Sequence, residues 1–204
     1  MTVTYSAIRP QITAVILAGG QGRRMGGKDK GLVKFANKPL IQSVIDKILP
    51  QVEQVIINAN RNTPDYEALG YRVISDAMNN FQGPLAGFMA AMEFVTTKYI
   101  VCVPCDGPML SDKLVERLAS QLLEDHADIA VAHDGHRMQP VYVLMSTHLK
   151  DSLEQYLLSD KRKIDQWYAN HKVTVVDFSD IPDTFININT RQERDALQSK
   201  RNAA

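Results

Sequence analysis

Glycine and cationic side chains are concentrated in one segment, which reads LAGGQGRRMGGKDKG between Leu17 and Gly31. Six of its fifteen residues are glycine and four are arginine or lysine. Glycine permits positive φ angles and lets backbone N–H groups approach a ligand, while the cations attract negative charge. The segment follows the apolar, β-branched run 12–17, which is typical of a buried strand. Together these features indicate binding of a chain of phosphate groups.

Two known phosphate-binding motifs match this segment only partly. The dinucleotide fingerprint G-x-G-x-x-G meets Met25 at its third glycine position. The P-loop spacing G-x-x-x-x-G-K reaches Lys28, but Asp29 follows in place of the Ser or Thr that would hold magnesium. A flexible glycine loop with solvated charges is the structural alternative.

An aspartate after a later strand lies in a position suited to holding a metal ion. Asp106 follows the apolar run 99–103 within the sequence PCDGP, whose prolines restrict the backbone. A carboxylate beside polyphosphate is repelled unless a cation intervenes, and Mg²⁺ takes one or two carboxylates with phosphate oxygens. Asp106 is therefore a candidate Mg²⁺ ligand, with capping of the next turn as the alternative. Asp76 also ends a strand, where it can accept hydrogen bonds from a base or ribose or belong to a plain turn.

The other reactive residue types do not form a catalytic pattern. Cys102 and Cys105 form a C-x-x-C, but they neither open a helix nor meet a second pair, so redox or zinc chemistry is not favoured. His133 and His136 flank Asp-Gly, a hairpin signature. Because no Ser–His–Asp or Cys–His pattern stands out, we expect direct transfer between bound groups without a covalent enzyme intermediate.

Length and composition favour one globular domain with a small anionic ligand. The chain has 204 residues, 45% of them hydrophobic, and its 23 basic and 23 acidic residues cancel. Because the protein has no net charge to attract polyanions, nucleic acid and membrane surfaces are not expected as partners. The positive charge is local, with six basic residues and one acidic residue between Gly20 and Lys38.

No run of apolar residues reaches the ~20 that are needed to span a membrane, and the N-terminus lacks the features of a secretory signal. A cytoplasmic location is therefore expected. Residues 1–204 are predicted to form a single domain, with 1–11 as a flexible tail.

Apolar runs predict strands that alternate with helices. Strands are expected at 12–17, 55–58, 71–74, 99–103, 129–132, 139–145 (in the antiparallel sense) and 173–178. Helices are expected at 40–49, 65–69, 149–158 and 164–170, after the Gly-Pro at 83–84, after Ser111 as N-cap, and after a T-x-x-E capping box at Thr190 and Glu193. This order predicts a doubly wound α/β fold with a mostly parallel twisted sheet and helices on both faces. Ligands bind such sheets beyond the carboxyl ends of the strands, where Asn58, Asp76, Asp106, Asn187 and Asn189 collect.

The segments LAGGQGRRMGGKDKGL, NKPL, INANR, QGPLAG, PCDGP and FININT resemble, in order and spacing, the molybdenum cofactor guanylyltransferases. The resemblance extends from about Ile12 to the capping box at Thr190. It implies a Rossmann-like nucleotidyltransferase fold and transfer of GMP from GTP to molybdopterin that already carries molybdenum. The products would be the guanine dinucleotide form of the cofactor and pyrophosphate. It also implies transient contacts with the proteins that make and accept the cofactor.

The resemblance further assigns roles to individual residues. By that carry-over, the nucleotide is contacted by the backbone of Leu17, Ala18 and Gly19, and its phosphates by Lys30. Asn58 and Asp76 help to read guanine and ribose, and Asp106 binds both nucleotide and Mg²⁺. Other positions associated with activity in that family match Arg24, Gly20, Gly27, Gly83, Asn187 and Asn189. Asn189 as a further metal ligand is a separate hypothesis, and the molybdopterin contacts do not carry over.

Three alternatives remain open from sequence. The chain could use CTP on the same cofactor, or transfer a nucleotide to a sugar or polyol phosphate. It could also bind GTP as a switch or regulator without transferring it. The absence of Ser or Thr after Lys28 argues against a P-loop switch.

Overall fold

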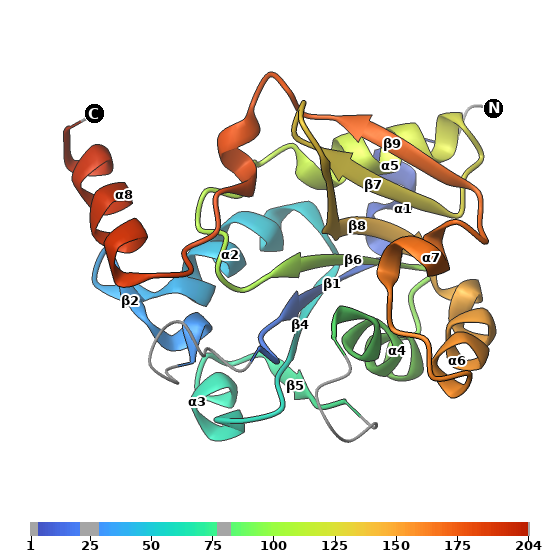
Figure 1. Ribbon diagram of the computed structural model, residues 1–204, viewed down its shortest axis with the longest axis horizontal. Coiled ribbons are helices and arrows are strands. Elements are labelled where there is room, and N and C mark those ends of the chain that lie inside the picture. The colour runs from blue at the N-terminus through green and yellow to red at the C-terminus, as the bar shows by residue number, and fades with distance from the viewer. Residues whose placement is uncertain (1–3, 21–28, 77–82, 204) are drawn as a thin grey trace.

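A seven-stranded sheet runs through the centre of the protein, in the strand order β5-β4-β1-β6-β8-β7-β9 (Figure 1). The computed structural model describes residues 4–20, 29–76 and 83–203, and the sheet and the helices lie within these ranges. Its strands are β1 Ile12–Leu17, β4 Gln54–Asn58, β5 Arg72–Ile74, β6 Tyr99–Pro104, β7 Ile129–His133, β8 Met138–Ser146 and β9 Val173–Asp177. A separate two-stranded hairpin is formed by β2 Lys34–Phe35 and β3 Lys38–Pro39.

Helices cover both faces of the sheet. The α-helices are α1 Tyr5–Ile8, α2 Leu40–Ile48, α3 Thr63–Glu67, α4 Pro84–Phe94, α5 Leu114–Glu124, α6 Lys150–Leu158, α7 Ile164–Tyr168 and α8 Arg191–Ala203. Short 3₁₀ turns are η1 Arg9–Gln11, η3 Lys30–Leu32, η4 Leu49–Gln51, η5 Thr147–Leu149 and η6 Pro182–Phe185. The predicted α/β fold, a mostly parallel sheet with helices on both faces, is confirmed.

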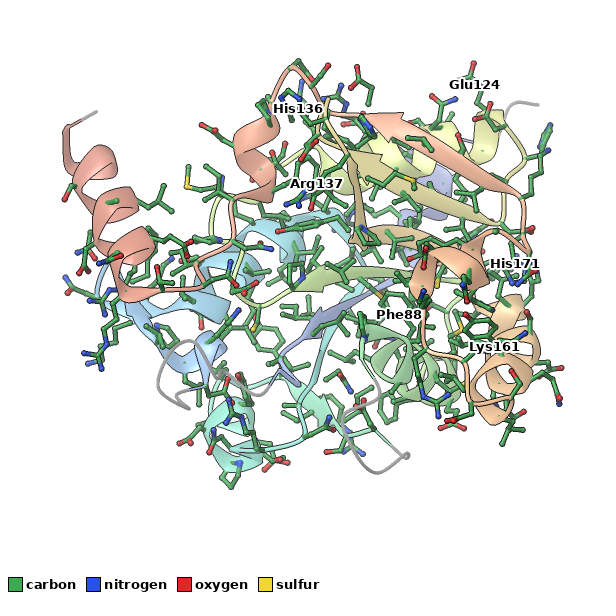
Figure 2. All side chains as sticks on the ribbon, in the orientation of Figure 1. Phe88, Glu124, His136, Arg137, Lys161 and His171 are labelled. Atoms are coloured by element: carbon green, nitrogen blue, oxygen red, sulfur yellow. The ribbon has the colours of Figure 1, made fainter. Side chains whose placement is uncertain are left out.

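Strand β1 is the centre of the sheet because its side chains are apolar on both faces. It pairs in parallel with β4 on one side and β6 on the other. Ile16 lies in a core formed with α1, α2 and α5, while Val15 faces the opposite core of α4, α6 and α7. Both residues are fully buried. In the second core Phe88 lies between α4 and the sheet (Figure 2). The carboxyl ends of β5, β4, β1 and β6 therefore meet at one edge, because all four strands are parallel.

Strand β8 runs antiparallel to both of its neighbours, β6 and β7, as predicted. The β7–β8 hairpin turns at Asp134–Arg137, so His136 lies at its tip (Figure 2). Partner pairing moves from Val131–Val143 to Ala132–Gln139, which leaves residues 140–142 in a bulge. A bulge bends its strand and re-aims side chains, and Pro140 cannot donate a ladder hydrogen bond there.

A third, small cluster fastens the C-terminal helix to the β2–β3 hairpin. Phe35, Leu40 and Ile188 are buried together, and Leu197 of α8 packs against them. This contact places the start of α8 beside the carboxyl edge of the sheet, next to η3 and the loop after β6.

The prediction of a flexible tail over residues 1–11 is wrong for the described part of it. Tyr5–Ile8 and Arg9–Gln11 form α1 and η1, and Ile8 is 4% exposed. The Tyr5 hydroxyl donates to the carbonyl of Gln51 at 2.6 Å, and Arg9 Nε donates to the carbonyl of Pro50 at 3.2 Å. One buried apolar side chain and two polar anchors hold a segment that is too short to show helical periodicity. A single domain over 1–204 stays a prediction.

Two local predictions also need correction. Ser111 precedes α5 but does not cap it directly; its Oγ accepts from the N–H of Lys113, and the helix begins at Leu114. Helix α7 ends at Tyr168, two residues before the predicted end.

Within the described residues, no helix combines the length and apolar character needed to cross a bilayer.

Candidate active site

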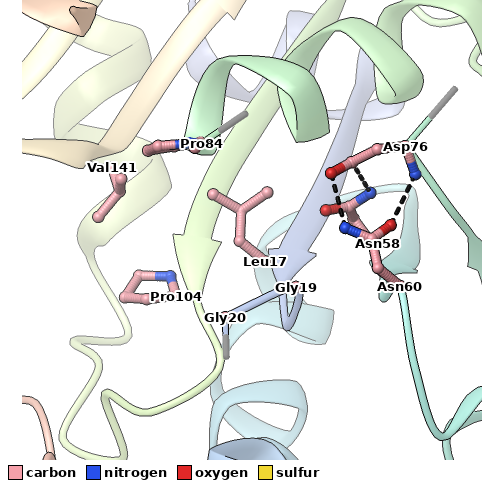
Figure 3. A pocket seen from close by; sticks show the side chains of 10 residues that line it. Leu17, Gly19, Gly20, Asn58, Asn60, Asp76, Pro84, Pro104 and Val141 are labelled. Carbon is pink, nitrogen blue, oxygen red and sulfur yellow. Dashed lines mark hydrogen bonds between the residues drawn. The ribbon is translucent and has the colours of Figure 1, made fainter. Parts of the chain in front are cut away.

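A cavity of about 500 Å³ opens at the carboxyl edge, between the ends of β1, β4 and β6. It is lined by Leu17, Gly19, Gly20, Asn58, Asn60, Asp76, Gly83, Pro84, Pro104 and Val141. Figure 3 shows Leu17 near its middle, with polar side chains on one side and apolar ones on the other. Its size is within the range of small-molecule sites.

The polar side of the cavity is a rigid network around Asp76. Its two carboxylate oxygens accept hydrogen bonds from Asn58 Nδ2 at 2.9 Å and Asn60 Nδ2 at 2.7 Å. The backbone N–H of Asp76 donates to Asn60 Oδ1 at 2.9 Å, which closes the ring of contacts. An ionised carboxylate can accept about four hydrogen bonds, so Asp76 keeps capacity for a ligand.

The apolar side of the cavity comes from Pro84, Pro104 and Val141. Val141 reaches this edge because it lies in the bulge of β8. Gly83 precedes α4 as its N-cap with φ of +79°, a conformation that side chains rarely adopt. The helix can therefore begin directly at the cavity.

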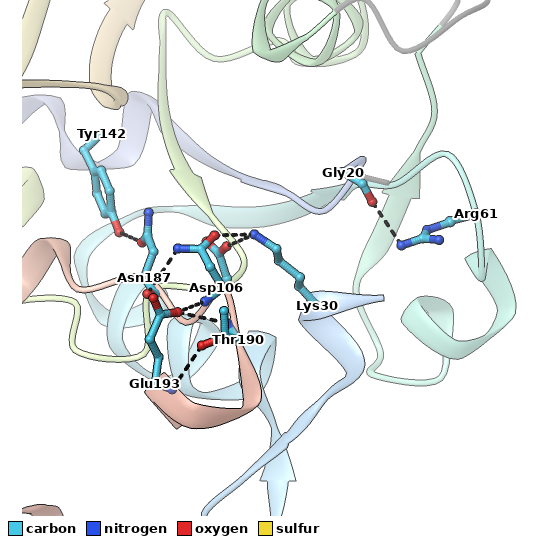
Figure 4. A network of polar contacts seen from close by, with 9 residues as sticks. Gly20, Lys30, Arg61, Asp106, Tyr142, Asn187, Thr190 and Glu193 are labelled. Atoms are coloured by element: carbon cyan, nitrogen blue, oxygen red, sulfur yellow. Dashed lines mark hydrogen bonds and ion pairs between the residues drawn. The ribbon is translucent and has the colours of Figure 1, made fainter. Parts of the chain in front are cut away.

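Beside the cavity, a second polar cluster is centred on Lys30 in η3 (Figure 4). The Lys30 ammonium donates to Asp106 Oδ2 at 3.0 Å and to Asn189 Oδ1 at 2.5 Å. Asp106 is 8% exposed and lies in the turn after β6. The N–H of Ile188 donates to the carbonyl of Asp106 at 2.9 Å, which ties the 187–189 segment to that turn.

The two asparagines of this cluster are held by their own partners. Glu193 Oε2 accepts from the backbone N–H of Asn189 at 2.7 Å and of Thr190 at 2.9 Å. The Thr190 hydroxyl accepts from the N–H of Glu193 at 3.1 Å, so the predicted capping box is confirmed. Asn187 Oδ1 accepts from the Tyr142 hydroxyl at 2.8 Å. Burial, followed by the nearby charge of Asp106, raises the pKa of Tyr142, which keeps it a hydrogen-bond donor.

The cluster contains the oxygen ligands that a divalent cation requires. Asp106 Oδ2 and Asn189 Oδ1 converge on one cationic group, Lys30 Nζ, from two different segments. Carboxylate and amide oxygens are hard ligands of the type that Mg²⁺ prefers, with phosphates and water completing its shell. The residues therefore fit such an ion, although the described part of the chain has no cluster of three His, Cys, Asp or Glu side chains.

Cysteine chemistry is not supported by the surroundings of the two thiols. Cys102 lies in β6 and Cys105 in the following turn, and both are buried. Burial raises the pKa of each thiol well above its usual value, so the reactive thiolate is disfavoured.

Most residues predicted for the site are brought to this edge. The cavity is lined by Leu17, Gly19, Gly20, Asn58, Asp76 and Gly83. The cluster beside it contains Lys30, Asp106 and Asn189 and adjoins Asn187. Ala18 is 2% exposed, and its N–H donates to the carbonyl of Asn58 at 2.8 Å within the sheet. The predicted Arg24 and Gly27 lie outside the described residues.

Sequence reasoning missed several contributors. Asn60 lies two residues after Asn58, and this alternate spacing was a usable signal that both face the same side. Val141 could have been suspected from Pro140, since proline within a strand marks an edge or a bulge. No local sequence pattern indicates that Tyr142 contacts Asn187, because 45 positions separate the two residues.

A mostly parallel α/β sheet, with a glycine-rich connection and a polar crevice at its carboxyl edge, defines a Rossmann-like nucleotide-binding protein. The sequence model of the MobA-like NTP transferase domain matches residues 14–175. The chain belongs to this family of nucleotidyltransferases.

Similar proteins agree with this membership. A protein of Shewanella sediminis named molybdenum cofactor guanylyltransferase is 52% identical over 187 residues, covering 92% of this chain and 95% of the relative. A Shewanella loihica protein of the same name is 49% identical over 188 residues, covering 92% and 96%.

Solved structures share the fold at low sequence identity. Molybdopterin-guanine dinucleotide biosynthesis protein A from Archaeoglobus fulgidus has a TM-score of 0.77 at 24% identity, covering 95% of this chain and 100% of that one. The 4-diphosphocytidyl-2C-methyl-D-erythritol synthase of Anaerococcus prevotii has a TM-score of 0.74 at 12% identity, covering 95% and 96%. The fold is therefore shared by proteins whose names refer to a guanine nucleotide and to a cytidine nucleotide.

Proposed function

We propose that this protein transfers GMP from GTP to the terminal phosphate of molybdenum-molybdopterin, forming the guanine dinucleotide cofactor and pyrophosphate. The observation that carries the proposal is the 52% identity, over almost the whole of both chains, with a relative named molybdenum cofactor guanylyltransferase. The site geometry supports it independently, since a nucleotide-sized cavity adjoins a lysine–aspartate pair.

In this proposal the base and ribose lie on the polar side of the cavity. Asn58 and Asn60 fix the orientation of the Asp76 carboxylate, so its remaining lone pairs can accept hydrogen bonds only from a defined direction. The Watson–Crick edge of guanine carries two adjacent donors, N1–H and the 2-amino group, which suit a carboxylate. Cytosine has one donor, its 4-amino group, beside acceptors at N3 and O2, and therefore suits it less. Leu17, Ala18, Gly19 and Gly20 would contribute backbone contacts to the nucleotide.

The phosphates would be bound by Lys30 together with Arg24 and the backbone at Gly27. An ammonium has three N–H donors, and Asp106 and Asn189 account for two of those of Lys30. The third can donate to a phosphate oxygen, so that Lys30 stabilises the charge of the leaving pyrophosphate. Gly83 and Asn187 would shape the site around the reacting groups.

Mg²⁺ would be held by Asp106, with Asn189 as a second ligand. When bound, the ion would neutralise phosphate charge and help to align the reacting groups. Lys30 Nζ, which contacts the same two oxygens, would keep its third donor for phosphate.

The reaction needs positioning more than covalent chemistry. An oxygen of the acceptor's terminal phosphate attacks the α-phosphorus of GTP in line, and pyrophosphate leaves with the bonding electron pair. No side chain is alkylated, acylated or phosphorylated in this scheme. The apolar side of the cavity at Pro84, Pro104 and Val141 would exclude water from the transferring group.

The test is a comparison of GTP, CTP and UTP with Mg²⁺ and molybdenum-loaded molybdopterin as acceptor. Pyrophosphate release with GTP, only when the acceptor is present, is the expected result. Preference for CTP would identify a cytidylyl transferase on the same cofactor, and turnover with a sugar or polyol phosphate would identify a different acceptor. GTP binding without pyrophosphate release would indicate a regulator. Cytoplasmic location and transient contacts with cofactor-biosynthesis and cofactor-accepting proteins stay predictions.

A further inference from the structure

The carboxylate of Asp29 is buried although its sequence neighbour Lys30 faces the candidate site. The Asp29 side chain is 3% exposed, against 24% for that of Lys30. Burying a charged group is unfavourable unless hydrogen-bonding and ionic partners surround it. The partners of Asp29 therefore indicate what this arrangement fixes.

Three side chains from the region after β4 meet the Asp29 carboxylate. The Tyr66 hydroxyl donates to Oδ1 at 2.5 Å, and Asn62 Nδ2 donates to Oδ2 at 3.0 Å. Arg61 Nε forms an ion pair with Oδ2 at 3.5 Å. The first described residue after positions 21–28 is thereby attached to α3 and the turn before it.

Arg61 also reaches the other side of the same segment. Its Nη2 donates to the carbonyl of Gly20 at 3.1 Å, as Figure 4 shows. Gly20 is the last described residue before positions 21–28, and Asp29 is the first after them. One guanidinium thus links both flanks of the glycine-rich segment.

Tyr66 connects this arrangement to the core. It is fully buried, and burial raises the pKa of its hydroxyl, so it remains a donor to Asp29. A Cβ on Gly31 would lie 2.6 Å from the Tyr66 hydroxyl oxygen and 3.3 Å from Cys105 Sγ. Only glycine lets the backbone of η3 approach this closely, and Lys30 begins that turn.

We propose that Asp29, Arg61 and Tyr66 act as positioning residues for the transfer reaction. They fix the flanks at Gly20 and Asp29, and so direct Lys30 toward Asp106, Asn189 and the phosphates. This loop anchor (Asp29, Arg61 and Tyr66) rests on the proposed function, because it acts through Lys30. None of its members needs to touch a reacting atom.

The test compares two substitutions that each remove one buried tyrosine hydroxyl. Tyr66→Phe breaks the bond to Asp29 and leaves the ring in place. Tyr156→Phe is the matched control, since its hydroxyl donates to the carbonyl of Lys163 at 2.8 Å, away from the site. We expect Tyr66→Phe to lower kcat/KM for GTP about tenfold, because small misplacements of a catalytic group are costly. Tyr156→Phe should change only the melting temperature.

A double-mutant cycle with Lys30→Ala separates positioning from a general loss of stability. If Tyr66 acts through Lys30, adding Tyr66→Phe to Lys30→Ala should lower kcat/KM by less than twofold. A full tenfold further loss would overturn the proposal, as would equal losses for the two tyrosine variants.

Calorimetry with inorganic tripolyphosphate distinguishes failure of this inference from failure of the proposed function. If the wild type binds tripolyphosphate but transfers no GMP, the proposed function is wrong, and the same cycle measured on tripolyphosphate affinity decides the role of the anchor. If the wild type neither transfers GMP nor binds tripolyphosphate, the proposed function and the anchor proposal are both overturned.

Discussion

Lys30 is the residue at which the two halves of the candidate site meet. Its ammonium contacts a carboxylate after β6 and an amide before α8, and its own turn follows the glycine-rich segment. A cation held by two oxygens is placed in advance of the substrate, which lowers the cost of organising charge during reaction.

We expect Lys30→Ala to lower the rate of GMP transfer by a factor on the order of 10² or more. The substitution should lower kcat but leave the stability of the fold nearly unchanged, since the Lys30 side chain is partly exposed. Steady-state kinetics of pyrophosphate release measures it, with Lys34→Ala as the control because Lys34 is an exposed lysine of β2. A loss of only twofold in Lys30→Ala would discredit the phosphate assignment.

Asp106 is expected to be indispensable for transfer but not for folding. We predict that Asp106→Ala abolishes GMP transfer over a range of Mg²⁺ concentrations, because the main ligand proposed for the ion is lost. Circular dichroism should still report a folded protein. The exposed Asp112, which pairs with Lys47, supplies the control Asp112→Ala. Near-normal turnover of Asp106→Ala would rule out its metal role.

At the scale of elements, the start of α8 completes the site. The helix is fastened by Leu197 to the cluster of Phe35 and Leu40, and its capping box presents Asn189 to Lys30. In the proposed site, the C-terminal helix would therefore contribute through the segment just before it, which Glu193 holds, while Leu197 supplies the attachment.

Removing the cap should weaken both the helix and the site. We predict that Glu193→Ala costs about 1 kcal/mol of stability and lowers kcat/KM several-fold, because the backbone of Asn189 loses its acceptor. Glu193→Gln should keep most of both, since glutamine also serves in a capping box. Chemical denaturation and transfer kinetics on the two variants test this. Equal activity of both variants would show that the cap does not position Asn189.

The elements that the sequence predicts well are those defined by apolar runs with clear boundary residues. Strands β1, β4 and β6 and the box at Thr190 and Glu193 belong to this group. The N-terminal helix was missed because its attachment depends on single contacts, such as that of Tyr5 with Gln51. Local pattern carries no information about such long-range partners.

The same distinction applies to the site. Residues at strand ends, such as Asn58 and Asp106, could be predicted because parallel strands bring their carboxyl ends together. The contacts that orient them, such as Tyr142 to Asn187, join segments far apart in sequence and required the structure. Arg24 and Gly27 stay predictions.

At the scale of the whole molecule, the crevice joins segments from nearly the full length of the chain. Residues from Leu17 to Val141 line the cavity, and Asn189 reaches the cluster beside it. A ligand bound there contacts parts of the protein that separate on unfolding. Binding should therefore stabilise the entire fold and not one element.

Thermal unfolding with nucleotide tests this coupling. Free ligand at 100 times its Kd stabilises the native state by about 2.7 kcal/mol. For a chain of this size, that corresponds to a rise in Tm of roughly 5 to 11 °C. We expect this rise with GTP and Mg²⁺, a smaller one with CTP at the same concentration, and little in Lys30→Ala. If CTP raised Tm as much as GTP does, the interaction proposed between Asp76 and guanine would not select the base.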